Sequence, residues 1–396
     1  MTVVGLALRY LRGRLVTTAL TALSIALGAA LVLASVLLTR GVEKTFMESA
    51  TEYSLVVGAK GSPTQLVLSV VFRMDTPTPN ILRATWERLA SDERVDVAVP
   101  VALGDAYQGF RYVATSPAYF AAMPWRQRSF AIARGRFARE DSIEQPSYEV
   151  VLGAETARRT GLQLDDRFFE GEEMAEYPLT VVGILRSTGT ADDRAVFLTL
   201  PSFWGMNEVA RKMQMKPLTA VLVRAKRMSD LPALHRQLNL SQETQAVFPS
   251  GVLLGIFNLL GLAEEVLALV LAIVAGVVVL YLFVSMYSAM RERRREIATM
   301  RALGARRATI LGLVLLESCL IALVGGGAGL VLGHGIAYGG ARLLASRAGM
   351  VADPFAVGLL QPAVLACVVI VGALAGLLPA LSAYRVDVEE NLAPLS

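Results

Sequence analysis

The segment "RERRREIATMRALGARRATILGLVLLES", from Arg291 to Ser318, lies between two long apolar runs. Seven arginines fall within its first seventeen residues, the densest positive charge in the chain. Basic residues of membrane proteins gather in cytoplasmic loops beside the ends of spanning helices. The segment therefore predicts a cytoplasmic loop. Its glutamates and apolar residues, which topology alone does not require, indicate a second role.

The composition of the whole chain is that of a membrane protein. Among its 396 residues 54% are hydrophobic and only 18% are charged, and the mean hydropathy is +0.51. Ordinary soluble proteins are less apolar than this. The net charge of +4 does not indicate a nucleic-acid partner, because the basic residues lie beside apolar runs and no nucleic-acid-binding motif is present. We expect a lipid membrane, and no nucleic acid, as the environment of the chain.

Four stretches are long enough to cross a bilayer core, which needs about 20 apolar helical residues. We predict transmembrane helices at 15–39, 263–290, 308–341 and 361–384. The first stretch is longer than the apolar part of a cleaved signal peptide, so we interpret it as a retained anchor. Gly251, Gly255 and Gly261 precede the second stretch. They argue against a stiff helical stalk there, and the sequence leaves this point open.

The positions of the arginines set the direction of the spans. Arginines before the first span, between the second and third, and after the fourth place both termini in the cytoplasm. The remaining segments follow from this topology. They are a cytoplasmic interfacial helix at 1–14, an extracytoplasmic domain at 40–262, a cytoplasmic helix at 291–307, a short external loop at 342–360 and a cytoplasmic tail at 385–396.

The segment 40–262 has a mixed α and β pattern. The stretches "VDVAVPVAL", "FRYVATS", "EYPLTVVGILRST" and "RAVFLTL" predict strands, and 154–160 predicts a helix closed by Gly161. The predicted fold class is an α-helical membrane protein with four transmembrane helices and a mixed α+β extracytoplasmic domain between helices one and two.

The sequence shows no enzyme site. The stretch Gly58 to Ser62 lacks the spacing of a phosphate-binding P-loop, and no other candidate occurs. The two histidines, His235 and His334, are far apart, so no metal cluster is expected. We interpret Asp192 and Asp193 as solvated turn residues. No cofactor is expected in this chain.

The arginine-rich segment also has the pattern of a short amphipathic helix. Glu292 and Glu296 lie three or four residues from several arginines, as on a solvated helix face. Ile297, Met300 and either Leu303 or Gly304 share one face at helical spacing. We expect this apolar face to form a knob that enters a groove on a cytoplasmic partner.

The stretch "RREIATMRALGARRATI" resembles the coupling segment of the FtsX/MacB-like permeases of ABC transporters. The order of one helix, a large external domain and three helices matches that family over the whole chain. "VVLGAETARRTGLQLDD", "LTVVGILRSTGTADDRAVFLTL", "LLES" with "GGGAGLVLG", and the closing "LPALSAYRVDVEENL" are similar too. Val388 stands where the family often has proline, a departure that affects only the tail.

The resemblance implies a dimer, with a second copy or a paralogue, that works with a separate cytoplasmic ATPase. ATP and Mg would bind on that ATPase, and a periplasmic binding or adaptor protein is a further candidate partner. The expected location is the bacterial inner membrane. The residues implied in ATPase coupling are Glu296, Ile297, Met300, Arg301, Ala302, Leu303, Gly304 and Ala305.

The third apolar stretch carries two further features. Gly325, Gly329 and Gly333 recur every four residues, a spacing that lets membrane helices approach closely. We expect helix packing there, within the chain or across a dimer. For Glu317, a proton relay would need an ionisable partner in another span, and we find none. Helix packing or contact with the interfacial arginines is therefore the preferred role.

These features predict a permease subunit that couples ATP hydrolysis on a partner to movement of the external domain. The cargo would be lipophilic or derived from the envelope: a lipoprotein, lipid, drug or peptide. Two alternatives stay open. One is a mechanotransmitter that regulates an extracytoplasmic enzyme, such as a cell-wall hydrolase, without moving cargo. The other is a sensor or adhesion anchor unrelated to ATP.

Overall fold

The structure is a computed structural model that describes residues 3–122, 130–169, 177–206, 216–292, 297, 299–300, 304–348 and 358–384. The chain folds into two compact units. The helical unit comprises residues 1–41, 261–341 and 353–396, and the sheet unit comprises residues 42–260 and 342–352. Three helices, α2 (Leu15–Thr51), α10 (Pro249–Glu292) and α12 (Arg307–Ala348), contribute residues to both units.

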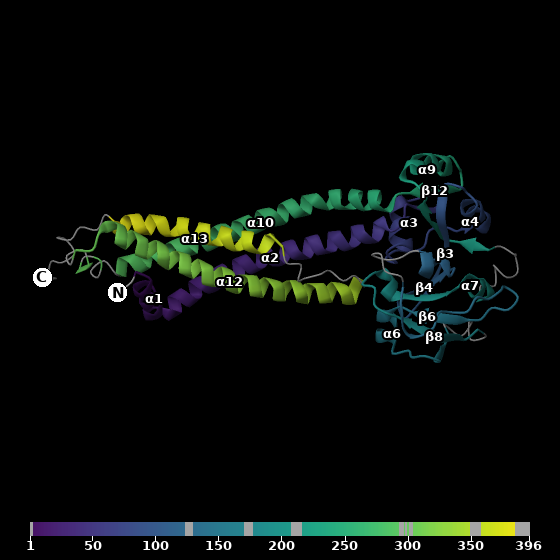
Figure 1. The fold of residues 1–396 in the computed structure, drawn as a ribbon, viewed down its shortest axis with the longest axis horizontal. Helices are drawn as coiled ribbons and strands as arrows, with labels where there is room; N and C mark the ends of the chain where they lie inside the picture. The colour runs from purple at the N-terminus through teal and green to yellow at the C-terminus, as the bar shows by residue number, and fades with distance from the viewer. Residues whose placement is uncertain are drawn as a thin grey trace. The chain divides into compact units, whose positions relative to one another are not determined.

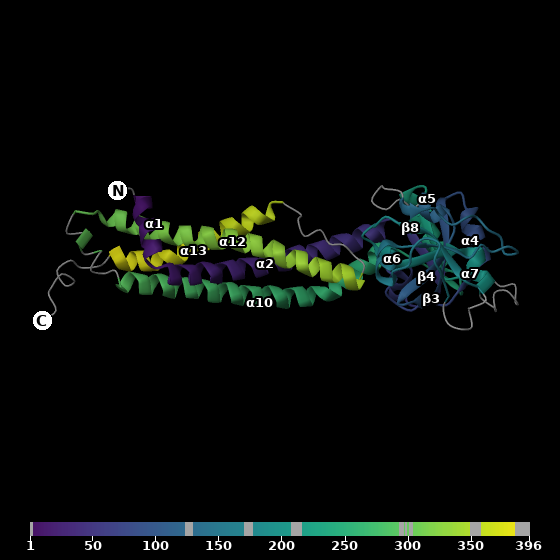
Figure 2. The same cartoon turned by 90° about the horizontal axis from the view of Figure 1, so that it is seen from below.

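The helical unit contains the four predicted spans. Besides parts of α2 and α10 it holds α1 (Val3–Gly13), most of α12 (Arg307–Ala348) and α13 (Leu360–Tyr384). Figures 1 and 2 show α2, α10, α12 and α13 running alongside one another. Among the described residues, four segments are long and apolar enough to cross a membrane. They are Leu15–Thr51, Glu264–Ser288, Ala308–Ala345 and Leu360–Leu377. The prediction of four spanning helices is confirmed.

Helix α10 is longer than its predicted span and passes through three glycines without a break. It begins at Pro249, before Gly251, Gly255 and Gly261. A glycine inside a helix costs about 1 kcal/mol relative to alanine. The apolar residues around these glycines outweigh that cost, so the argument for an interrupted helix is wrong.

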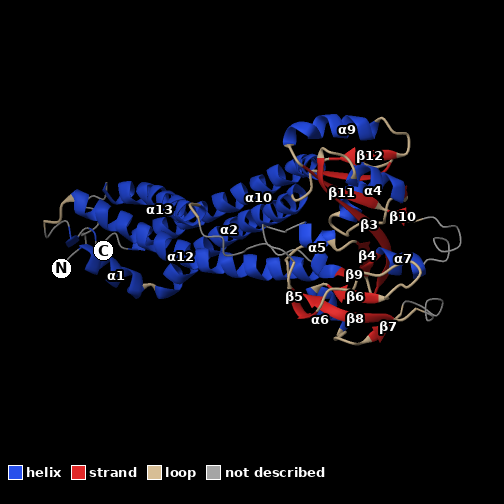
Figure 3. Ribbon diagram, turned by 45° about the vertical axis from the view of Figure 1, so that its right-hand side comes forward, coloured by secondary structure: helices blue, strands red, loops and turns tan. Residues whose placement is uncertain are grey.

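The sheet unit is built on one ten-stranded sheet, drawn in red in Figure 3. The strand order is β12-β1-β11-β3-β4-β9-β6-β8-β5, with β7 paired to β8, and β10 pairs with β2 separately. The strands are β1 (Leu55–Ala59), β2 (Ile81–Leu82), β3 (Val95–Tyr107), β4 (Phe110–Thr115), β5 (Ile132–Gly135), β6 (Glu149–Leu152), β7 (Arg167–Phe168), β8 (Leu179–Leu185), β9 (Ala195–Thr199), β10 (Pro217–Leu218), β11 (Ala220–Ala225) and β12 (Thr244–Val247).

Helices cover both faces of this sheet. They are α3 (Pro63–Val70), α4 (Arg83–Ala90), α5 (Ala118–Ala122), α6 (Ala154–Thr160), α7 (Leu200–Met206) and α9 (Leu231–Asn239), with short 3-10 turns η2 (Ala191–Arg194) and η3 (Met228–Asp230). One apolar cluster contains residues of α4, α6, α7 and α9. The other contains residues of α3 and α5, the end of α2 and the start of α10.

The covering on both faces explains the sequence pattern of the strands. In β9, Val196 and Leu198 enter the first cluster, while Ala195 and Phe197 enter the second. Alternate side chains of a strand point to opposite faces, so a strand covered on both sides reads as a continuous apolar run. The four predicted strands and the helix 154–160 are confirmed, and Gly161 ends that helix in the left-handed conformation.

One interpretation from the sequence is wrong. Asp192 and Asp193 are not solvated, because both are buried. Asp193 accepts hydrogen bonds from the Ser187 hydroxyl at 2.7 Å and from the amides of Thr188 and Gly189 at 2.8 Å each. These bonds replace the water that a turn carboxylate normally binds.

Candidate functional site

The structure describes part of the expected coupling segment. Ile297, Met300, Gly304 and Ala305 belong to the described residues. Four further residues of the predicted set lie outside them: Glu296, Arg301, Ala302 and Leu303.

The apolar face of this segment is covered by its own chain. Ile297 is only 4% exposed and belongs to an apolar cluster that includes Met290 of α10 and Ile310 of α12. Met300 packs against the same cluster, and the Tyr10 hydroxyl of α1 lies 4.0 Å from its sulfur. Ile297, expected in the apolar knob, is thus covered within the chain, and its role in coupling stays a prediction. An apolar stripe gains most by burial against the nearest apolar surface, which here is the helical unit itself.

Gly304 ends the segment with a turn that favours glycine. Its φ is +93°, and the amide of Ala305 donates to the carbonyl of Met300 at 3.0 Å. This is the left-handed ending common at helix C-termini. Gly304 and Arg306 are both exposed, and α12 begins directly after them. Of the expected coupling residues that the structure describes, Gly304 is exposed and Ile297 is buried.

The three spaced glycines of α12 lie against α2 of the same chain. A Cβ added at Gly325 would lie 2.8 Å from the carbonyl oxygen of Ala22. One added at Gly329 would lie 2.7 Å from Cβ of Ala29. At Gly333 it would meet Leu33 at 3.0 Å. We call this contact the glycine seam. Contact at such short range between α2 and α12 requires glycine at these positions.

Glu317 is buried on α12, at 6% exposure. Its helix neighbours Val314 and Ile321 belong to the same apolar cluster as Ile297. A carboxylate at this depth is costly unless it is partnered. Its burial among packed helices agrees with the preferred packing role, which stays a prediction.

An apolar cavity of about 180 Å³ lies between α2, α10 and α13. Its walls include Gly28, Val278, Cys367 and Gly372.

A polar contact joins α12 and α13 elsewhere in the helical unit. The Gln361 amide at the start of α13 lies 3.5 Å from Nε2 of His334 on α12.

The sheet unit has a second apolar cavity, of about 350 Å³, which we call the phenylalanine cavity. Four of its lining residues carry aromatic rings that contact one another: Phe120, Phe130, Phe137 and Phe197. The hydroxyl of Thr115, which also lines it, is already bonded to the carbonyl of Pro100 at 2.9 Å. The walls therefore suit an apolar group better than a hydrogen-bonding one.

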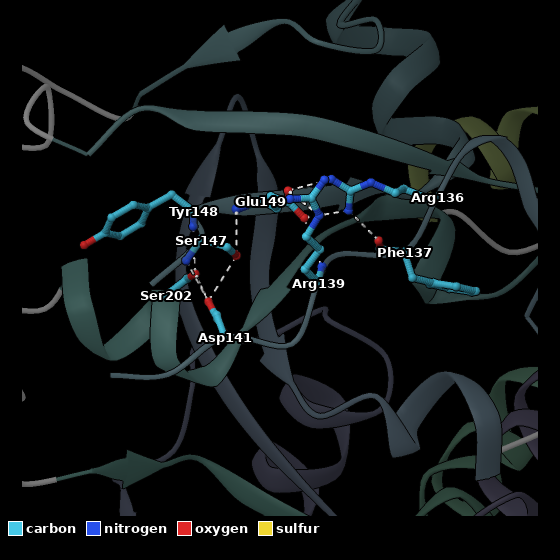
Figure 4. A network of polar contacts seen from close by, with 8 residues as sticks. All are labelled: Arg136, Phe137, Arg139, Asp141, Ser147, Tyr148, Glu149 and Ser202. Carbon is cyan, nitrogen blue, oxygen red and sulfur yellow. Dashed lines mark hydrogen bonds and ion pairs between the residues drawn. The ribbon is translucent and has the colours of Figure 1, made fainter. Parts of the chain in front are cut away.

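The segment that carries Phe137 is fixed by an ion pair on one side, shown in Figure 4. Arg136 donates to both oxygens of Glu149 of β6, at 2.7 and 2.6 Å. The amide of Arg139 donates to the same carboxylate at 2.9 Å. Hydrogen bonding from Arg136 lowers the pKa of Glu149, and burial opposes this shift.

On its other side the segment is fixed by Asp141, also shown in Figure 4. Oδ2 of Asp141 accepts from the amide of Ser147 at 2.9 Å and from the hydroxyls of Thr199 and Ser202 at 2.7 Å each. Phe137 thus lies between two anchored positions. The sequence analysis missed this site. The signal in the sequence was Phe137 beside Arg136, Arg139 and Asp141.

Two family profiles match the chain. The MacB-like periplasmic core domain matches residues 18–240, and the FtsX-like permease C-terminal domain matches residues 268–387. The first match alone covers more than half of the sequence. The chain belongs to the FtsX/MacB-like family of ABC transporter permeases.

The relatives of this FtsX/MacB-like permease include two kinds of named exporter. It is 26% identical over 407 residues to the macrolide export ATP-binding/permease protein MacB of Azoarcus sp. (strain BH72), covering 96% of this chain and 58% of that protein. It is 38% identical over 133 residues to the pyoverdine export ATP-binding/permease protein PvdT of Pseudomonas syringae pv. syringae (strain B728a), covering 33% of this chain and 18% of that protein. The permease thus spans about three fifths of the length of the MacB relative.

Solved structures also resemble the permease. The periplasmic region of MacB from Actinobacillus actinomycetemcomitans matches with a TM-score of 0.36 and 11% identity, over 52% of this chain and 95% of that one. The extracellular domain of the transporter YknZ from Gram-positive bacteria matches with a TM-score of 0.32 and 13% identity, over 49% of this chain and 98% of that one. The profile matches, together with four spanning helices, make this an ABC permease of the inner membrane.

Proposed function

We propose that this permease couples ATP hydrolysis on a cytoplasmic ATPase to movement of the sheet unit, for export or extraction of lipophilic or envelope cargo. The observation that carries the proposal is the continuity of α2 and α10. Each is a single helix with residues in both units. A rigid helix transmits a displacement at one end to the other, as packed elements do in hinge and shear motions.

The C-terminal end of α2 and the N-terminal end of α10 pack inside the sheet unit. We call these two packed ends the roots of the helices. Phe46 of α2 and Phe257 of α10 have ring centroids 6.1 Å apart at a nearly perpendicular angle. Ala50 of α2 and Leu253 of α10 are fully buried in the second apolar cluster of the sheet unit. A shift of either helix would therefore displace packed side chains rather than a loose tether.

ATP and Mg would bind on the ATPase, because the 396-residue sequence has no P-loop. The docking surface we propose is the exposed turn at Gly304 and Arg306. The family resemblance implies that the sequence from Glu296 to Ala305 also takes part in coupling. Both termini would face the cytoplasm. The second permease copy or paralogue, and a periplasmic adaptor, complete the proposed assembly.

The phenylalanine cavity supports a lipophilic cargo, since it offers an apolar space to part of an amphipathic molecule. The relatives are named for export of macrolides and of pyoverdine. We extend export to this chain and leave the identity of the cargo open.

The test is binding of an ABC ATPase from the same genome to the permease in lipid nanodiscs. Gly304→Arg places a bulky cation at the proposed docking turn, and we expect at least a tenfold weaker affinity. Gly109→Arg is the matched control, because Gly109 also has a positive φ and open space around it, on a turn of the sheet unit. Equal affinities for the two variants would contradict docking at Gly304.

A second measurement separates cargo movement from mechanical signalling. If a cell-wall hydrolase bound residues 42–260 and was activated in an ATP-dependent way, with no cargo moved, the mechanotransmitter would replace the exporter. ATP-dependent release of a fluorescent lipopeptide from proteoliposomes would support the exporter.

A further inference from the structure

Four polar side chains from four separate segments meet inside the second apolar cluster of the sheet unit. Tyr53 follows α2, Arg73 follows α3, Tyr119 lies on α5 and Asp192 lies in η2. The Tyr119 hydroxyl donates to Oδ1 of Asp192 at 2.8 Å. Nη2 of Arg73 lies 3.3 Å from the Tyr119 oxygen and 3.5 Å from Oδ1 of Asp192. Tyr53 is buried beside them: burial and the charge of Asp192 raise its pKa, and Tyr119 opposes that shift. We call these four residues the Arg73 network.

The network is costly to maintain. Arg73 has a φ of +57°, a backbone conformation that a long side chain rarely adopts. Its side chain is 4% exposed, and its Nε and Nη1 atoms have no hydrogen-bond partner among the described residues. Burial raises the pKa of Asp192, while the charge of Arg73 opposes that shift. Buried ion pairs are often less stabilising than apolar residues of the same volume, so stability alone does not explain this one.

The topology shows what the network connects. Strands β12, β1, β11, β3 and β4 form one half of the sheet, and β9, β6, β8, β5 and β7 form the other. The halves join through the parallel pair of β4 and β9. Tyr53 and Arg73 flank β1 and α3 of the first half, whereas Asp192 directly precedes β9 of the second. The network crosses this junction, and through Tyr53 it reaches the root of α2.

The loop that carries Asp192 is itself well fixed. Asp193 holds residues 187–189 through the hydrogen bonds described above. Gly153, just before α6, fits closely against the backbone of both aspartates. Asp192 is therefore a rigid part of the second half, and Arg73 contacts it from the first.

We propose that Arg73 and Asp192 are positioning residues that lock the two halves of the sheet together at the root of α2. A displacement of α2 then moves the sheet unit as one body. The movement of the sheet unit with α2 rests on the proposed function, whereas the lock between the two halves of the sheet does not.

The experiment measures the distance between the halves in the full chain in lipid nanodiscs, without ATPase. Spin labels are attached through Met228→Cys in the first half and Gln163→Cys in the second, both at exposed positions. Cys319→Ala and Cys367→Ala remove the native thiols. Pulsed electron paramagnetic resonance should give one narrow distance distribution. Asp192→Asn should at least double its width, because Arg73 loses its charged partner.

Asp141→Asn is the control, since Asp141 also accepts several hydrogen bonds but does not contact the Arg73 network. We expect it to keep the narrow distribution. The double variant Arg73→Met with Asp192→Asn separates positioning from stability. Removing both buried charges should restore the melting temperature but leave the distribution broad. If Asp192→Asn fails to fold, this double variant decides the question.

Three results would overturn the proposal. The first is a distribution that stays narrow without Asp192. The second is equal broadening in Asp141→Asn. The third is a double variant that regains both the melting temperature and the narrow distance, since the pair would then be structural only. Because no ATPase is present, these results are independent of whether the docking turn at Gly304 is correct.

Discussion

Helices α12 and α10 are both long and apolar enough to cross a membrane, yet the chain packs them very differently. In the most apolar 18-residue stretch of α12, 44% of the residues are buried within the chain. In the corresponding stretch of α10, only 6% of the residues are buried. The more apolar helix is the less buried one. Lipid is as apolar as a leucine side chain, so hydrophobicity does not drive membrane helices together.

Small residues explain the difference. The glycine seam brings α12 against α2 at Gly325, Gly329 and Gly333. Gly276 of α10 has no other atom within 4 Å of the position of an added Cβ. Hydropathy therefore locates a span, whereas the spacing of small residues locates the face that packs.

The largest effect is expected at the packed end of α10. Met286 is 3% exposed and lies in the cluster with Ile297, whereas Val277 of the same helix is 60% exposed. Met286→Ala should cost about 2–5 kcal/mol of unfolding free energy, because it leaves a cavity. Val277→Ala, at an exposed position, should stay within about 0.5 kcal/mol. Equal losses in unfolding titrations of the two variants would show that α10 is buried along its length, contrary to the contrast with α12.

A smaller effect is expected at the glycine seam. Gly329→Leu forces a side chain into Ala29 and the backbone of Ala26, and overpacking of this kind typically costs about 1–3 kcal/mol. Gly335→Leu on the same helix is the control, because nothing lies within 4 Å of an added Cβ there. Thermal unfolding in the same detergent compares them. A seam variant as stable as the control would mean that α2 and α12 do not touch at Gly329.

The smallest effect concerns the ion pair between Arg136 and Glu149 in the sheet unit. The pKa of Glu149 is lowered in the folded state, so the unfolded chain binds a proton more readily. The stabilisation is present above the usual glutamate pKa of about 4.5 and is lost as pH falls through the lowered value. Glu149→Gln and Arg136→Gln should each flatten the decline in stability below about pH 4.5. An unchanged slope in both variants would rule out this ion pair as its source.

The sequence predicted the features that depend on local pattern. Apolar length predicted the four spans, and Gly161 marked the end of α6. The glycine spacing identified the packing face of α12 but not its partner. Helical periodicity likewise identified the apolar face of Ile297, but it contains no information on which surface covers that face.

Contacts between distant segments were not predictable. Asp192 reads as a turn residue because its partners Tyr119 and Arg73 lie 73 and 119 positions away. The four phenylalanines of the cavity come from segments between Phe120 and Phe197 that only the folded sheet brings together. A single sequence records each residue type but not such pairings.

The most direct test of coupling to an ATPase uses a photo-crosslinking amino acid at the exposed position of Arg306. Leu359, which is 88% exposed in the predicted external loop, is the matched control position. We expect irradiation of cells to join Arg306, and not Leu359, to an ABC ATPase with an intact P-loop, identified by mass spectrometry. Capture of the ATPase from Leu359 instead, or from neither position, would contradict the proposed coupling.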